Sequence, residues 1–229
     1  MTARTLNLWR KNMGIAFYVP LVIVLVYLPL ISVVAIRMNQ FGNVDAIPMD
    51  KSYLAFLFSI EVALPVMTLL PFFSILWPLF ISREAVESHG YELLHIMGKR
   101  KVWYAQLAFF TLYVILVALL FIGYNLHYGT FVWLHFFRLV AIFIYLFGLM
   151  KALLLISHSS GITLLVLLVF VLVNHVMLNQ NGTYPFYFKW GQLEGLSDLI
   201  PNLAHACTGV LLLLITTYVP FRDKFVPVS

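Results

Sequence analysis

The chain has 229 residues, of which 62% are hydrophobic and only 10% are charged. A soluble domain is typically about 45–50% apolar and about 25% charged, so a water-soluble fold could not cover this much apolar surface, and lipid is the expected solvent. The formal net charge of +5 could indicate nucleic acid. The basic residues, however, flank apolar segments and form no continuous stripe, which indicates membrane topology instead.

Six segments are long and apolar enough to cross a hydrocarbon core of about 30 Å, which takes roughly 20 residues. They are about 13–36, 53–82, 102–124, 131–156, 161–178 and 200–221. No segment alternates polar and apolar residues over about ten positions, as the strands of a membrane barrel do. The expected fold class is therefore an all-α integral membrane protein with six transmembrane helices, forming one domain over residues 1–229.

The amino end combines a basic start with an apolar run, as a signal peptide does. That run is too long for a signal core and lacks a convincing A-x-A-like cleavage site, so we expect a retained first helix. Most of the fourteen Lys and Arg residues then fall on the side of the amino end. This asymmetry predicts that both termini are cytoplasmic in the cell membrane.

Residues 81–106 are the most charged stretch of the chain and join the second and third expected spans. They include Arg83, Glu84, Glu87, Glu92 and the run 99–101. One interpretation is an interfacial elbow whose basic run lies at anionic headgroups. The other is a docking surface for a partner protein. The residue pattern leaves both open.

This stretch resembles the membrane subunit of an ABC-2-type ABC transporter. That family often has an acidic residue, a glycine and then Glu-Leu-Leu on a short cytoplasmic helix, followed by a basic cluster that opens the third span. The matching residues here are Glu87, Gly90, Glu92-Leu93-Leu94 and Lys99-Arg100-Lys101. Gln106 departs from the family pattern, because it stands where a basic residue is often found.

The resemblance implies a cytoplasmic coupling helix between the second and third helices that seats on a separate ATPase subunit. The implied ATPase-coupling residues are Glu84, Glu87, Gly90, Glu92, Leu93, Leu94, Lys99, Arg100 and Lys101. The chain has no G-x-x-x-x-G-K-[ST] phosphate loop. ATP and Mg would therefore bind the partner ATPase, and this chain would bind no cofactor. The resemblance also implies a second permease subunit, identical or different.

Ionisable and polar residues inside the expected spans gather near the outer side. They are Glu61, His135, Arg138, Asn174, His175 and His205, at depths of up to about 12 Å. These side chains could snorkel to the outer headgroups. Alternatively, they could form an outer vestibule on the substrate path, with Glu61 and Arg138 paired. A metal site is disfavoured, because HExxH is absent and no carboxylate stands at ligand spacing.

Two local patterns predict breaks in the helices. The prolines of the first two spans, Pro20, Pro29, Pro65, Pro71 and Pro78, predict kinks that serve as joints or as static bends. The sequence SHSSG at 157–161 predicts a cytoplasmic turn.

The function expected from the resemblance is ATP-driven export of an amphipathic or hydrophobic substrate, such as a peptide, a lipid-linked molecule or a drug. The chain itself would then not be an enzyme. Two alternatives stay open. One is a membrane-embedded, lipid-modifying enzyme that uses Glu61, His135 and His175. The other is a non-transporting membrane protein that senses, or confers immunity to, a membrane-active peptide.

Overall fold

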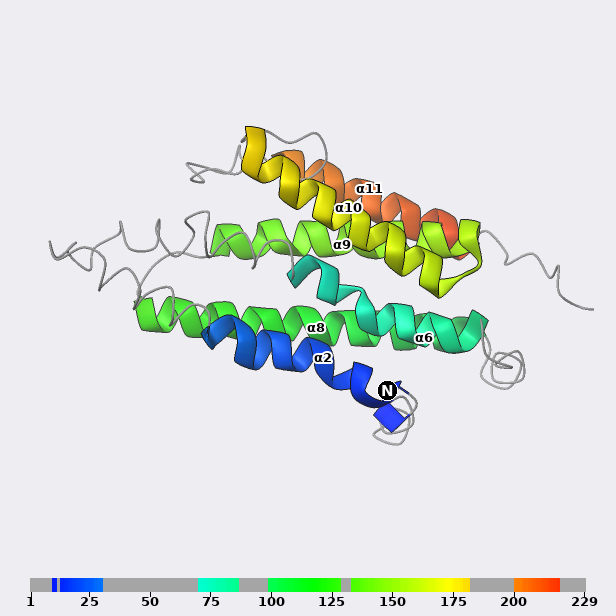
Figure 1. Ribbon diagram of the computed structural model, residues 1–229, viewed down its shortest axis with the longest axis horizontal. Coiled ribbons are helices and arrows are strands. Elements are labelled where there is room, and N and C mark those ends of the chain that lie inside the picture. Colours follow the sequence, from blue (N-terminus) through cyan, green and yellow to red (C-terminus); the bar gives the residue numbers. More distant parts are fainter. Residues whose placement is uncertain are drawn as a thin grey trace, which may run out of the picture.

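The computed structural model describes residues 10–11, 13–30, 70–86, 99–128, 133–181 and 200–218. Over these ranges the chain is helical and contains no strand, which confirms the all-α expectation for that part of the molecule. The helices labelled in Figure 1 lie side by side along the long axis of the molecule.

The first helix changes type along its length. A 3₁₀ turn, η1 (Gly14–Phe17), leads into α2 (Tyr18–Val22) and then into a π segment, η2 (Ile23–Tyr27). A proline ring clashes with the carbonyl four residues before it, and for Pro29 that residue is Leu25, in the middle of the π segment. The prolines of this helix therefore explain why it is not a regular α-helix.

The helix α6 (Leu76–Val86) follows a shorter helical stretch, 70–74, from which a turn at Ile75 separates it. Pro78 has no N–H to donate to the carbonyl of Ser74, so the regular ladder is interrupted here. At the turn itself, the Ile75 N–H bonds the carbonyl three residues before it, that of Phe72, at 3.3 Å. Helix α6 also continues to Val86, beyond the boundary at 82 expected from the sequence.

The remaining helices are long and mostly uninterrupted. They are α8 (Lys99–Tyr128), α9 (Trp133–Ser157), α10 (Ser160–Asn181) and α11 (Ile200–Tyr218). Two 22-residue segments within them, Val102–Gly123 and Phe136–Ser157, are long and apolar enough to cross a membrane, judged by length and composition. These two helices suggest a membrane location.

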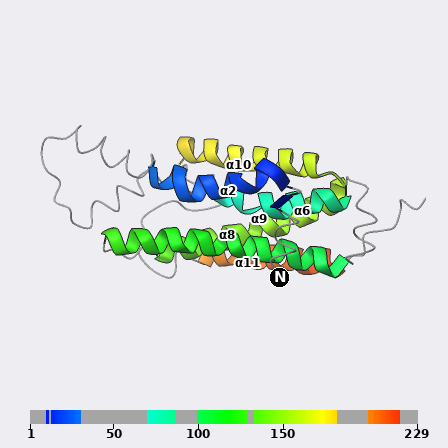
Figure 2. The same cartoon turned by 90° about the horizontal axis from the view of Figure 1, so that it is seen from below.

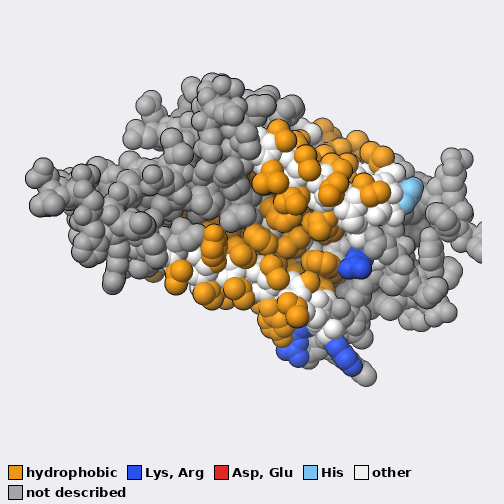
Figure 3. All heavy atoms as spheres, in the orientation of Figure 1, with side chains coloured by type: hydrophobic (Ala, Val, Ile, Leu, Met, Phe, Trp, Pro, Cys, Tyr) orange, Lys and Arg blue, Asp and Glu red, His pale blue; other side chains and the backbone are white. Residues whose placement is uncertain are grey.

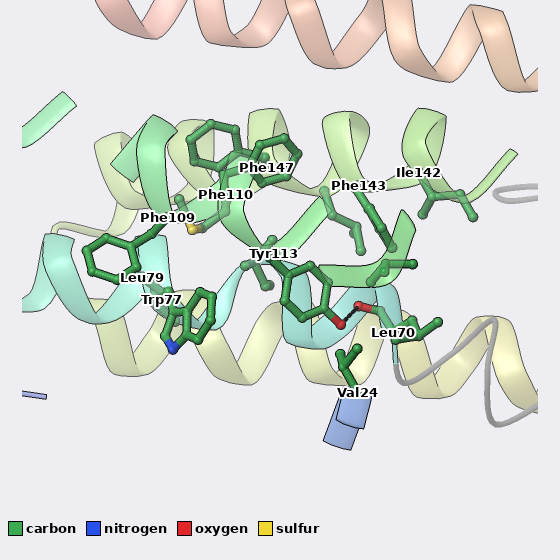
Figure 4. Close-up of a cluster of buried hydrophobic side chains, with 14 of the residues drawn as sticks. Val24, Leu70, Trp77, Leu79, Phe109, Phe110, Tyr113, Ile142, Phe143 and Phe147 are labelled. Atoms are coloured by element: carbon green, nitrogen blue, oxygen red, sulfur yellow. Dashed lines mark hydrogen bonds between the residues drawn. The ribbon is translucent and has the colours of Figure 1, made fainter. Parts of the chain in front are cut away.

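The helices form two groups. The first helix and α6 lie along α8, whereas α10 and α11 lie along α9 (Figure 1). Helix α10 also contacts α6 across the two groups, and in Figure 2 it lies on the same side of the bundle as the first helix and α6. Buried aromatic side chains fill the space between the groups. Tyr113 of α8 meets Phe143 of α9 with ring centroids 5.7 Å apart, and Phe110 stacks on Phe147 at 4.7 Å (Figure 4).

The outer surface of the bundle is apolar. Large hydrophobic side chains are exposed along α8, α10 and α11, for example Leu119, Leu165 and Leu211. On the face seen in Figure 3, Lys and Arg side chains gather toward one end, and hydrophobic side chains cover most of the rest of the described surface. This distribution is typical of helices that face lipid along their length and water at an end.

Candidate functional site

The residues expected to couple to an ATPase lie mostly outside the described ranges. Residues 87–98, which include Glu87, Gly90 and Glu92-Leu93-Leu94, are among them. Glu84 belongs to α6, and residues 99–101 form the first turn of α8. The two helices that the charged stretch connects, α6 and α8, are packed against each other.

A buried hydrogen-bonded cluster joins α6 to α8 close to that stretch. Gln106 is 1% exposed and Ser82 is 4% exposed. The Gln106 Nε2 group donates to Ser82 Oγ and, at 3.4 Å, to the Pro78 carbonyl. Ser82 Oγ donates to the same carbonyl at 2.9 Å. The Gln106 Oε1 atom is buried and has no hydrogen-bond partner among the described residues.

Two further side chains join α6, and the short stretch 70–74 before it, to neighbouring helices through backbone carbonyls. The Tyr113 hydroxyl of α8 donates to the Leu70 carbonyl at 2.8 Å (Figure 4). The Trp77 indole N–H donates to the Phe17 carbonyl of the first helix at 2.9 Å. Phe17 is the N-cap residue of α2, so this bond ties α6 to the point where the 3₁₀ turn passes into the α-helix.

A cation–π contact joins α8 to α9 at the same end of the bundle. The Lys151 Nζ atom lies 4.9 Å from the ring centroid of Trp103. The Trp103 ring is in turn nearly parallel to Phe147, with centroids 5.9 Å apart. Lys151 is the last charged residue of α9, and this contact brings its cation onto the aromatic surface of α8.

The six residues of the expected outer vestibule are described to different extents. Glu61 lies outside the described residues. His135 belongs to α9, and Asn174 and His175 belong to α10, but their side chains are not among those described. The side chains of Arg138 and His205 are described and lie on α9 and α11.

Arg138 is enclosed by the protein rather than exposed at its surface, with 2% of its area accessible. Snorkelling to headgroups therefore does not describe this residue. Its helix is parallel to α11, because the ring of Tyr145 meets that of His205 at 5.2 Å and Gly148 meets Gly209 one turn further along.

Asn202 is a second buried polar residue at this interface, with 3% exposure, and it is not among the site residues expected from the sequence. The contacts between α9 and α11 place Asn202 about one turn of helix from Arg138, which is about 5 Å measured along the helix axis. The two residues and the Tyr145–His205 pair form a polar stretch along the first halves of α9 and α11. An amide three residues before His205, in an otherwise apolar helix, is the sequence signal that indicates a buried polar position here.

Ser82, Gln106 and Tyr113 were also not predicted as site residues. Gln106 departs from the family pattern, and an amide one turn inside an apolar span is itself a signal of a specific contact. Among the described residues, no group of three or more His, Cys, Asp or Glu could hold a metal ion, and Cys207 is exposed.

No protein-family model, no curated protein and no solved structure matches this chain.

Proposed function

We propose that this chain is the membrane-spanning subunit of an ABC-2-type exporter, driven by a separate cytoplasmic ATPase. The observation that carries the proposal is the buried contact of Gln106 with Ser82 and Pro78. It holds α6 and α8 together close to the charged residues that connect them. A partner that pushed on this connection would act on two helices already joined to each other.

The distribution of charge supports the orientation. Arg10, Lys11 and Arg83 are exposed near the amino end of the first helix and the carboxyl end of α6. In membrane proteins such basic residues are enriched on the cytoplasmic side. With six spans, both termini and the charged stretch 87–98 would then face the cytoplasm, where an ATPase is available.

The substrate would be amphipathic or hydrophobic, because the described interior is mostly apolar and offers little to a small hydrated ion. The polar stretch of Arg138, Asn202 and His205 would lie in the outer half of the bundle. It would form part of the vestibule through which the substrate leaves.

The working unit would contain two membrane subunits and two ATPase subunits, with ATP and Mg bound by the ATPases. Charged residues suit the contact between them, because electrostatic complementarity gives orientation and fast association more than tight burial. Glu84, Glu87, Glu92 and the run 99–101 are the residues we assign to this contact.

Affinity purification of the tagged chain in a mild detergent tests the proposal. We expect a P-loop ATPase to copurify in equal amount with the chain, and the complex to hydrolyse ATP in vesicles. A chain that purifies without an ATPase and modifies lipid would instead support the lipid-modifying enzyme. A chain with neither property would support the sensor or immunity protein.

A further inference from the structure

We propose that the Gln106–Ser82 contact makes α6 and α8 move as one body, so that force on the stretch between them reaches the aromatic interface with α9. Gln106 and Ser82 are positioning residues in this proposal, which rests on the proposed function. The proposal adds two details to that function. Movement is transmitted at the contact between α6 and α8, and it occurs at the aromatic interface between α8 and α9.

The first support is that α8 holds the segment 70–86, made of the short helical stretch 70–74 and α6, at two separate heights. Gln106 bonds Ser82 and Pro78, and Tyr113 bonds the carbonyl of Leu70. The two donors are seven residues apart on α8, which is two turns and about 10 Å along one face. Two directional bonds at different heights, one to α6 and one to the stretch before it, oppose both sliding and pivoting of residues 70–86 on α8.

The second support is the cost of burying the amide. The Gln106 side chain is enclosed, and its Oε1 atom has no hydrogen-bond partner among the described residues. An apolar side chain of similar size would avoid that cost. A buried amide that bonds the neighbouring helix instead fixes the relative position of the two helices, as polar groups do in other helix pairs.

The third support is the different chemistry of the interface with α9. There, Phe147 stacks on Trp103 and on Phe110 with interplanar angles of 3° and 12°. Offset ring stacking is attractive over a range of displacements, whereas a hydrogen bond weakens steeply with misalignment. Movement between the two helix groups is therefore easier along this stack than between α6 and α8.

Reversible cross-linking of the copurified complex tests these three points. In a Cys207→Ser background, one variant carries Ser82→Cys with Gln106→Cys, and a matched variant carries Phe110→Cys with Phe147→Cys. Each is treated with a short bifunctional methanethiosulfonate, which dithiothreitol reverses. The measurement is ATP hydrolysis in vesicles of phosphatidylcholine and phosphatidylglycerol, with the four single-cysteine variants as controls for the reagent.

We expect the α6–α8 cross-link to leave the rate within about twofold, because the covalent link replaces a contact that does not open. The α8–α9 cross-link should lower the rate at least tenfold, and dithiothreitol should restore it. Adding Gln106→Leu to the α8–α9 pair should remove most of this inhibition, because the ATPase would then no longer drive α8. A purely structural role for Gln106 would not change the response to the cross-link. If Gln106→Leu does not accumulate, Ser82→Ala breaks the same contact.

Two results would overturn the proposal while leaving the exporter function intact. One is an α6–α8 cross-link that arrests hydrolysis as strongly as the α8–α9 cross-link. The other is full inhibition by the α8–α9 cross-link in the Gln106→Leu or Ser82→Ala background. A chain that purifies with no ATPase overturns the proposed function itself, and this inference with it.

Discussion

Gly148 of α9 and Gly209 of α11 approach each other so closely that neither position has room for a side chain. A Cβ atom on Gly148 would lie 2.9 Å from the Cα atom of Gly209. A Cβ atom on Gly209 would lie 2.6 Å from the Cα atom of Tyr145. The backbones of the two helices are thus in contact at this point, which is how helices often associate in lipid.

Replacing either glycine with alanine should force the two helices apart. We expect Gly148→Ala and Gly209→Ala each to cost about 1–3 kcal/mol, since the clash is with backbone that cannot rotate away. The midpoint temperature for loss of the monodisperse peak in detergent measures the effect. Gly123→Ala is the matched control, because a Cβ atom there meets nothing within 4 Å. It should be neutral or stabilising, and equal losses at all three positions would contradict the close approach.

The turn between α9 and α10 contains a strained residue. His158 has φ of +51°, which a side chain with a Cβ atom rarely adopts. We expect His158→Gly to raise thermal stability by about 1 kcal/mol and His158→Val to lower it, because glycine alone adopts this conformation without strain. An increase with valine equal to that with glycine would show that the histidine ring, and not the backbone, is responsible.

Ser159, in the same turn, caps the amino end of α10. Ser159 Oγ accepts from the Ile162 N–H at 3.4 Å, as the N-cap of α10. Ser159→Ala should therefore destabilise by about 0.5–2 kcal/mol, whereas Ser159→Asp should retain the cap. The same thermal measurement in detergent separates the two variants, and equal stability of both would argue against capping.

The contact of Lys151 with Trp103 should be measurable as a coupling between α8 and α9. We expect a double-mutant cycle of Lys151→Met and Trp103→Leu to give a coupling energy of about 0.5–2 kcal/mol in thermal stability. Lys151→Arg keeps the cation and should retain most of the stability. Additive effects of the two substitutions would exclude a direct contribution from the contact.

The orientation predicts which positions an impermeant thiol reagent reaches in intact cells. In a Cys207→Ser background, cysteines at Asn43 and Asn181 should be labelled, and one at Ser88 should be labelled only after the membrane is opened. Labelling of the Ser88 position in intact cells would reverse the proposed topology.

The docking role predicts that charge reversal at Glu87 and Glu92 lowers the amount of ATPase recovered with the chain. We expect Glu87→Lys with Glu92→Lys to reduce copurification at least fivefold without changing membrane insertion, because both residues lie in the expected aqueous loop. Glu194→Lys with Asp198→Lys changes the net charge equally in the expected outer connection and should leave recovery unchanged. Normal recovery with the first pair would remove the docking assignment.

The helical ranges of this protein were largely readable from composition and length. The expected spans 102–124 and 131–156 coincide with α8 and α9, and the turn expected at 157–161 separates α9 from α10 at residues 158–159. The helical state follows from local properties, since an uninterrupted apolar run has few ways to satisfy its backbone in lipid. Helices α8 and α9 are long and apolar enough to cross a membrane, and the crossing itself remains a prediction for every helix of the chain.

The chemistry of the proposed site was only partly readable. The charge of the stretch 81–106 and the presence of Arg138 and His205 in apolar spans were evident from the residues alone. The burial of Arg138 was not, because a long cationic side chain near a helix end can reach headgroups or turn inward with the same local sequence. The neighbours on other helices decide between the two.

The sequence by itself determined the expected solvent of this protein, the positions of most described helices and the places where prolines interrupt them. Only the tertiary structure decided that Gly148 meets Gly209, that Gln106 bonds Ser82, and that Phe147 stacks between Trp103 and Phe110. In water, an apolar stripe identifies the face of a helix that packs inward. In lipid, both faces are apolar, so hydropathy carries no such signal. The contact faces then depend on the fit between side chains far apart in the chain, which appears only when the helices are assembled.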